Sequence, residues 1–113
     1  MLNKEHDITL DLILQAAEKI IDFLNGYDLS KFLTDPKTQS AVIMQIIVIG
    51  ELSKKLSEEI KANINLPWRE MAGFRDFAVH DYFILDLNKV WDTATQDVPT
   101  VLEKLRFYIK TKS

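Results

Sequence analysis

Residues 41–50 read AVIMQIIVIG, and this stretch decides the fold. Its apolar side chains surround the segment at helical spacing, and Gln45 is the only polar residue among them. A helix that is apolar on nearly every side is buried on several sides, or it is buried on one side and covered by a second subunit on the other. The stretch therefore predicts a central helix, and both kinds of burial remain open.

Gly50 closes this stretch and stands inside the expected helix. Glycine in a helix interior destabilises it by up to ~1 kcal/mol relative to alanine. A close approach of another helix would offset that cost, because glycine has no Cβ to keep a neighbouring backbone away. We therefore expect a second helix to pack against Gly50.

Helical patterns continue towards the N-terminus. A predicted helix begins near Asp7 and stops at Asn25-Gly26, where glycine favours a helix end. Its buried stripe follows the i, i+3, i+4, i+7 spacing through Leu10, Ile13, Leu14, Ala17, Ile20, Ile21 and Leu24. Asp35 followed by Pro36 matches an N-cap and a first helical position. From there the central helix is predicted to run to about Ala62.

Helical patterns also continue towards the C-terminus. A shorter helix is predicted for residues 67–79, and Asp86 is the expected cap of a further helix over residues 87–109. Pro99 interrupts that last pattern, so we expect a kink there or a restart capped by Asp97. No segment alternates with a period of two. The sequence therefore predicts an all-α helical bundle.

Composition and charge are those of one ordinary globular domain over residues 1–113, with 47% hydrophobic and 27% charged residues. The chain has no cysteine, which excludes disulfides, thiolate metal sites and cysteine nucleophiles. Its net charge is −3, whereas a general nucleic-acid binder is normally basic. If RNA is bound, we therefore expect local contacts made by a few arginines and lysines.

The first ten residues, MLNKEHDITL, carry charges where the apolar region of a secretory signal would lie. The apolar stretch 41–50 is far shorter than the ~20 residues that span a bilayer. We expect a soluble, cytoplasmic protein without membrane contact.

Residues 75–82 read RDFAVHDY and contain the side chains best suited to chemistry. In this R-x4-H-x-Y pattern, Arg75 is a fixed cation for phosphate, His80 titrates near neutral pH, and Tyr82 supplies a phenol. These are the groups that cleavage of RNA without a metal ion would require. No metal-ligand cluster and no glycine-rich loop accompany them, so we expect neither a metal nor a cofactor.

Each part of the motif also has a purely structural interpretation. Arg75 projects from an apolar helix face, where it either binds phosphate or forms an ion pair with an acid such as Glu51. Asp76 and His80, four residues apart, can meet on one face. The carboxylate would then fix the imidazole tautomer for proton transfer, or the two would form a surface ion pair of little energetic value.

The spacing of Arg75 and His80 adds a constraint. Five residues place them ~140° apart on an ideal helix, too far to serve one phosphate. The motif therefore predicts that the helix ends near His80, or that two chains each contribute to one site. Tyr82 would return to the side of the arginine if the helix continued.

Three blocks of the chain resemble the HepT-like branch of the HEPN superfamily: IGELSKKLS (49–57), LPWREMAGFRDFAVHDYF (66–83) and DLNKVWDTATQDVP (86–99). The resemblance implies a HEPN-type antiparallel bundle of four to five helices that forms a homodimer and brings two motifs to one cleft. It implies the endoribonuclease toxin of a toxin–antitoxin pair, with Arg75 and His80 catalytic and Asp76 and Tyr82 supporting.

The same resemblance implies a partner, a minimal nucleotidyltransferase antitoxin that attaches AMP to Tyr82, and possible larger assemblies with it. Two other interpretations stay open. The chain could be a non-catalytic helical module that docks a nucleotidyltransferase or binds a nucleotide in the same cleft, or a bundle that serves only dimerisation.

Overall fold

Helix α3 (Pro36–Ser53) packs against α1 (Lys4–Phe23) on one side and against α5 (Trp68–His80) on another. The computed structural model describes residues 4–112, and the side chains of residues 8–112. Asp35 caps α3 as expected, since its carboxylate accepts a hydrogen bond from the backbone N–H of Thr38 at 3.1 Å and Pro36 follows it. The central helix predicted from the stretch 41–50 is confirmed.

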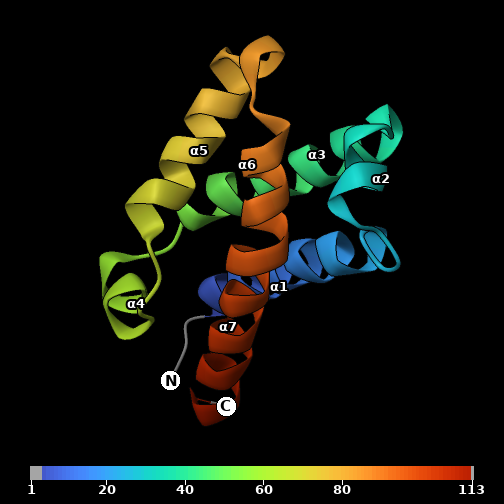
Figure 1. Ribbon diagram of the computed structural model, residues 1–113. Coiled ribbons are helices and arrows are strands. Elements are labelled where there is room, and N and C mark those ends of the chain that lie inside the picture. Colours follow the sequence, from blue (N-terminus) through green and yellow to red (C-terminus); the bar gives the residue numbers. More distant parts are fainter. Residues whose placement is uncertain (1–3, 113) are drawn as a thin grey trace.

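Helix α1 runs antiparallel to α3 (Figure 1). Most of its predicted stripe is buried, with Leu10, Ile13 and Ile20 fully shielded from solvent, whereas Ile21 is 38% exposed. The helix is followed by Gly26, whose φ of 81° lies in the left-handed region that glycine adopts without strain. The short helix α2 (Leu29–Leu33) then returns the chain to the start of α3.

The prediction that the central helix continues to Ala62 is wrong. Helix α3 ends at Ser53, and a separate helix α4 (Glu58–Asn63) follows a turn. Ser57 leaves the helical conformation, and its hydroxyl accepts a hydrogen bond from the N–H of Ile60 at 3.2 Å. Leu56 and Ile60, on either side of this cap, are both buried in the core.

Helix α5 rises along one side of the molecule and ends in a 3-10 turn, η1 (Tyr82–Ile84). The chain then reverses into α6 (Leu87–Asp92), which Asp86 caps through the N–H of Asn88 at 2.9 Å. Figure 1 shows α5 and α6 as two arms of a hairpin whose tip lies at the top of the view. The predicted helix over residues 67–79 and the predicted cap at Asp86 are confirmed.

Helix α6 continues into α7 (Val98–Lys112) through a π-helical segment, η2 (Thr93–Asp97). The N–H of Val98 donates to the carbonyl of Thr93, five residues back. This wider turn immediately precedes Pro99, which has no N–H to donate and would crowd a regular turn. Asp97 therefore lies inside a continuous helical rod and does not cap a restarted helix, contrary to that alternative.

The long helices α1, α3, α5 and the α6–α7 rod enclose the apolar core, and the described residues form no strand. The all-α bundle is confirmed, with α2 and α4 as short additions. None of the described helices is both long and apolar enough to cross a bilayer.

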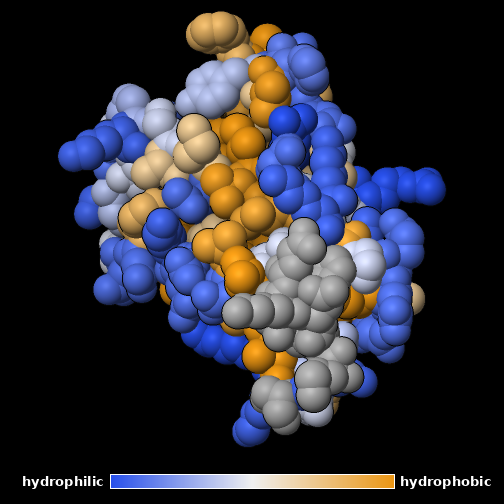
Figure 2. Space-filling model, turned by 180° about the vertical axis from the view of Figure 1, so that it is seen from behind, coloured by the Kyte–Doolittle hydropathy of each residue, from blue (hydrophilic) through white to orange (hydrophobic). Residues whose placement is uncertain are grey.

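The outward side of α3 remains apolar. Val42, Ile43, Ile46 and Ile49 are buried, whereas Met44 is 55% exposed and Ile47 and Val48 are half-buried. Figure 2 shows a band of hydrophobic residues along the face of the molecule opposite to that of Figure 1. In the single chain the stretch 41–50 is therefore buried on several sides, by α1 and α5, and within it only Met44 is exposed.

Candidate functional site at the contact of α3 and α5

Gly50 and Arg75 are where α3 and α5 come closest. A Cβ atom added to Gly50 would lie 2.5 Å from the Cβ of Arg75 and 2.9 Å from the carbonyl oxygen of Met71. Both distances are shorter than real Cβ contacts, so only glycine fits at this position. The expectation that another helix packs closely against Gly50 is confirmed, and that helix carries the motif.

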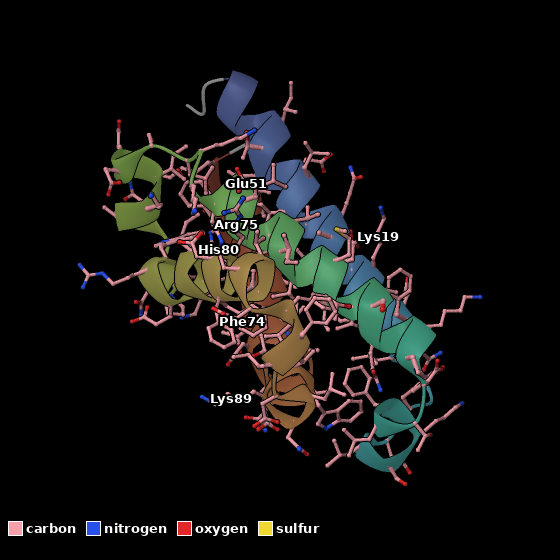
Figure 3. All side chains as sticks on the ribbon, turned by 90° about the horizontal axis from the view of Figure 1, so that it is seen from above. Lys19, Glu51, Phe74, Arg75, His80 and Lys89 are labelled. Atoms are coloured by element: carbon pink, nitrogen blue, oxygen red, sulfur yellow. The ribbon has the colours of Figure 1, made fainter. Side chains whose placement is uncertain are left out.

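The guanidinium of Arg75 is held by two carboxylates. Its Nε lies 2.8 Å from Oε2 of Glu51 on α3, and its Nη1 donates to Oδ1 of Asp76 at 3.0 Å. Figure 3 shows Arg75 and Glu51 pointing toward one another between the two helices. Nε and Oε2 are shielded from solvent, but the N–H direction is not that of a hydrogen bond, so this contact is a charge pair. The ion pair with Glu51 that the structural interpretation of Arg75 predicted is present.

The rest of the Arg75 side chain is accessible. It is 26% exposed, and Nη2 has no partner among the described residues and is not one of the shielded atoms. A guanidinium has five N–H donors, and a phosphate can be bound by those that remain. The ion pair and phosphate binding are therefore compatible.

Asp76 contacts cations from two helices. Besides Nη1 of Arg75, its Oδ1 accepts a hydrogen bond from Nζ of Lys54 on α3 at 2.6 Å. The hydrogen bond from Lys54, and secondarily that from Arg75, holds the pKa of Asp76 below its ordinary value of 3.8. Sequence reasoning missed Lys54, although it stands four residues after Gly50, one turn further along the helix that α5 approaches.

His80 is the last residue of α5, so the predicted helix end at the histidine is observed. Its side chain is exposed and makes no hydrogen bond or ion pair with any described residue. The expected meeting of Asp76 and His80 therefore does not occur in the single chain. The Asp76 carboxylate is instead drawn toward α3, where Lys54 and Arg75 both donate to its Oδ1.

Tyr82 lies in the turn η1 and is 41% exposed. Its hydroxyl is 3.3 Å from Oγ of Ser40, near the start of α3. Three motif residues, Arg75, Asp76 and Tyr82, are thus tied to α3, whereas His80 is not. The single chain holds the arginine and the tyrosine in place and leaves the imidazole free to meet a ligand or another chain.

The network of Glu51, Arg75, Asp76 and Lys54 contains as many acidic as basic groups. The four side chains together therefore carry no net charge at neutral pH. An anion would be attracted through directed N–H donors and not through a broad positive field.

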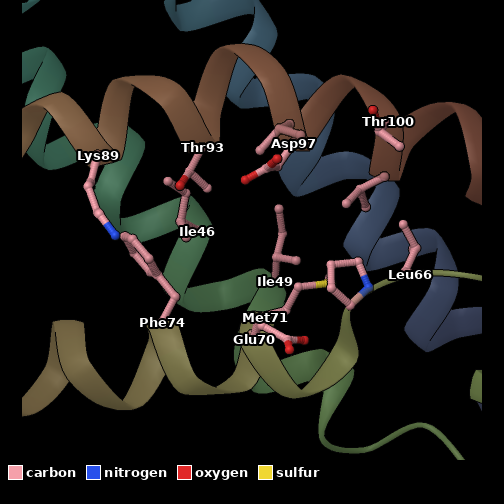
Figure 4. Close-up of a pocket in the computed structure, with 14 residues that line it drawn as sticks. Ile46, Ile49, Leu66, Glu70, Met71, Phe74, Lys89, Thr93, Asp97 and Thr100 are labelled. Atoms are coloured by element: carbon pink, nitrogen blue, oxygen red, sulfur yellow. The ribbon is translucent and has the colours of Figure 1, made fainter.

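A separate cavity of about 300 Å³ lies on the other side of α5. Figure 4 shows Lys89, Thr93 and Asp97 of the α6–α7 rod on one side of it, and Met71 and Phe74 of α5 on the other. Neither Arg75 nor His80 lines this cavity. The Arg75 and His80 side chains thus lie outside this cavity.

Comparison with known proteins identifies the family. Residues 13–107 match the family described as ribonuclease HepT-like. The chain is 38% identical to a protein of Thermococcus cleftensis named "Probable ribonuclease HepT", over 93% of this chain and 99% of that one. It is 39% identical to a protein of Methanocaldococcus jannaschii named "Putative RNase", over 87% and 82% of the two chains.

A bacterial relative, a "Putative RNase" of Caldanaerobacter subterraneus, is 31% identical over 86% of this chain and 88% of its own. No solved structure matches the chain. The profile match covers most of the chain, and these relatives are aligned over nearly their whole lengths. The protein therefore belongs to the ribonuclease HepT-like family.

Proposed function

We propose that the protein is a metal-independent endoribonuclease that uses Arg75, His80 and Tyr82. The observation that supports this best is that Arg75 is held in place with donors to spare, while His80 has no partner among the described residues. The guanidinium of Arg75 is fixed from two sides with Nη2 still accessible, and the imidazole of His80 stands unpaired at a helix end. The names of the relatives, which describe ribonucleases, point to the same substrate.

RNA provides its own nucleophile, the 2′-hydroxyl, which DNA lacks. The 2′-oxygen attacks the adjacent phosphorus as it loses its proton, and the bond to the 5′-oxygen breaks as that oxygen gains one. His80 removes or delivers a proton, an effect typically worth about 10²–10⁴-fold in rate. Arg75 binds the phosphate oxygens on which charge develops, Asp76 supports the arginine, and Tyr82 orients the phosphate by hydrogen bonding.

The active unit we propose is a homodimer. Two features of the single chain support it: Met44 on the outward side of α3 is an exposed apolar residue, and His80 makes no hydrogen bond with Arg75 or Tyr82. A second copy packed on α3 would cover the apolar residues and bring a second motif to the same cleft. Arginine and histidine would then serve one phosphate without sharing a face of one helix.

The protein partner we propose is a minimal nucleotidyltransferase that acts as antitoxin in the cytoplasm, alone or in a larger assembly with the dimer. The phenol oxygen of Tyr82 attacks the α-phosphorus of ATP, AMP becomes attached, and pyrophosphate leaves. The exposure of Tyr82, whose hydroxyl contacts only the hydroxyl of Ser40 among described residues, is compatible with this modification. The added bulk and negative charge would oppose RNA binding.

The direct test is cleavage of an RNA oligonucleotide, and of DNA with the same sequence, in the presence of EDTA. Wild type should cut the RNA and leave the DNA intact, and Arg75→Ala should lose about 10² or more of the rate. Arg69→Ala is the matched control, since Arg69 is an exposed arginine on the same helix. Equal rates for Arg75→Ala and wild type would refute the proposal, as would a well-folded wild type that cuts no RNA.

A second candidate is a non-catalytic module that docks a nucleotidyltransferase or binds a nucleotide. The observation in its favour is that two carboxylates already neutralise Arg75. Expression in a host cell separates the two. A ribonuclease toxin slows growth when it is made alone, and growth recovers when the antitoxin is made with it. A docking module leaves growth unchanged in both conditions.

A further inference from the structure

We infer that Glu51 is a positioning residue for the cleavage reaction: it sets the orientation in which Arg75 meets the scissile phosphate. This inference rests on the proposed function. It adds a residue outside the R-x4-H-x-Y motif, carried by a different helix. Its basis is the contact between Nε of Arg75 and Oε2 of Glu51, 2.8 Å apart and shielded from solvent.

The backbone places Glu51 where it can do this. Its neighbour Gly50 allows α5 to approach until the Cβ of Arg75 lies against α3. The arginine side chain therefore starts beside the backbone of α3, and the carboxylate of Glu51 receives its Nε edge. The position of the guanidinium is fixed by the packing of two helices and not by the conformation of one side chain.

Two carboxylates contact different nitrogens of the same planar group. Glu51 contacts Nε and Asp76 contacts Nη1, and two contacts at different nitrogens fix the orientation of the planar group while Nη2 keeps its N–H donors without a partner among the described residues. Lys54 holds Asp76 in turn, at 2.6 Å. A phosphate therefore meets a donor group whose orientation is set before the RNA binds, the condition under which a directed charge is most effective in catalysis.

Stability alone does not account for the pair. Glu51 is 44% exposed, and partly exposed ion pairs contribute little to the folded state. An apolar residue at position 75 would continue the apolar face of α5 without a charge to satisfy. The opposite functional effect is also physically possible, because a carboxylate beside the guanidinium repels phosphate. If Glu51 positions Arg75, removing Glu51 lowers the cleavage rate; if Glu51 repels phosphate, removing it raises the rate or the affinity for RNA. A kinetic experiment therefore distinguishes the two effects.

The test compares three variants in RNA cleavage. Glu51→Ala removes the side chain together with its charge, and Glu51→Gln removes the charge but keeps the size of the side chain. Glu18→Ala is the matched control, because Glu18 forms another ion pair between helices, with Arg106 at 2.8 Å. Melting temperatures are measured alongside kcat and KM.

We expect Glu51→Ala to lower kcat about 10–100-fold with little change in KM, the signature of a misplaced catalytic group. Because the contact is a charge pair, Glu51→Gln should lose nearly as much of the rate as Glu51→Ala, and Glu18→Ala should match wild type. The inference is overturned if Glu51→Ala cleaves faster than wild type or binds RNA more tightly, since Glu51 would then be a competitor of the phosphate. It is also overturned if only the melting temperature changes.

A second measurement does not depend on activity. The Nε–H of Arg75 can be observed by ¹⁵N NMR, and its exchange with water should be slower than that of exposed Arg69 in wild type and faster in Glu51→Ala. Equal exchange for the two arginines would refute the contact itself. If exchange is slow but wild type cuts no RNA, the contact stands, and both the proposed function and the catalytic role of Glu51 fail.

Discussion

Gly50 and Arg75 lie so close that a Cβ atom on the glycine would be 2.5 Å from the Cβ of the arginine. This contact positions Arg75 and Asp76 relative to α3, because their ion pairs with residues of α3 form only when the two helices are this close. The ion pair of Arg75 with Glu51 and the hydrogen bond from Lys54 to Asp76 both cross the same interface. The close packing that Gly50 allows therefore also brings the charged residues of the site together.

Gly50→Ala should destabilise the protein. The new methyl group overlaps Arg75 and the backbone of Met71, and overpacking of this kind typically costs about 1–3 kcal/mol. Gly73→Ala is the control on α5, since a Cβ there meets no atom within 4 Å, and it should stabilise by about 0.5–1 kcal/mol through helix propensity. Chemical denaturation at one protein concentration measures both, and a Gly50→Ala variant as stable as Gly73→Ala would contradict the close packing.

Lys54→Met should raise the pKa of Asp76 towards its ordinary value of 3.8. The hydrogen bond from Lys54 is the main reason the pKa is low, and Arg75 alone would keep part of the shift. Because the pKa is lowered in the folded state, the stabilisation is present above the ordinary value and disappears as pH falls through the lowered one. NMR titration of the Asp76 carboxyl carbon checks this, and an unchanged pKa would show that Lys54 does not contact Asp76 in solution.

Tyr27→Phe should raise the pKa of Asp35, which its hydrogen bonds lower from 3.8 to about 2. The largest cause is the Tyr27 hydroxyl, which donates to Oδ2 of Asp35 at 2.6 Å. The variant should be less stable than wild type near neutral pH, and the difference should fade as pH falls from about 4 to about 2. Tyr82→Phe, whose hydroxyl contacts Ser40 instead, should leave the titration of Asp35 unchanged. A normal pKa for Asp35 in wild type would contradict the network.

Met44→Lys should weaken the proposed homodimer. It places a charge on the apolar outward side of α3, and a charge buried without a partner should raise the dissociation constant at least about 10-fold. Phe107→Lys is the control, since Phe107 is 69% exposed but lies on α7. Sedimentation equilibrium measures the dimer dissociation constant of both variants, and only Met44→Lys should raise it. A dimer broken by Phe107→Lys and not by Met44→Lys would place the interface elsewhere.

Local sequence signals predicted most of the helices. The apolar phase of α1, the glycine at position 26 and the Asp35-Pro36 pair each act within one turn of the chain, so they could be read without a structure. The break after Ser53 could not, because residues 53–57 are compatible with a helix or a turn. Leu56 and Ile60 continue the helical spacing of Ile49 and Ser53, so the apolar pattern gives no sign of the break, which is seen only in the folded chain.

The site divides in the same way. The sequence placed the helix end at His80 and a neighbouring helix at Gly50, both consequences of residue type and spacing. It paired Asp76 with His80, because the rule for residues four apart considers one helix only. The structure pairs Asp76 with Lys54, whose presence depends on the register between α3 and α5.

The measurement that tests the central claim most directly is the single-turnover rate of RNA cleavage, in EDTA, by wild type and by His80→Gln. Glutamine can form hydrogen bonds but cannot transfer a proton near neutral pH, and the His80 side chain is exposed at the end of α5, so the change should leave the core unaltered. The account predicts a loss of about 10²-fold or more with an unchanged circular dichroism spectrum. Equal rates for the two proteins would contradict it.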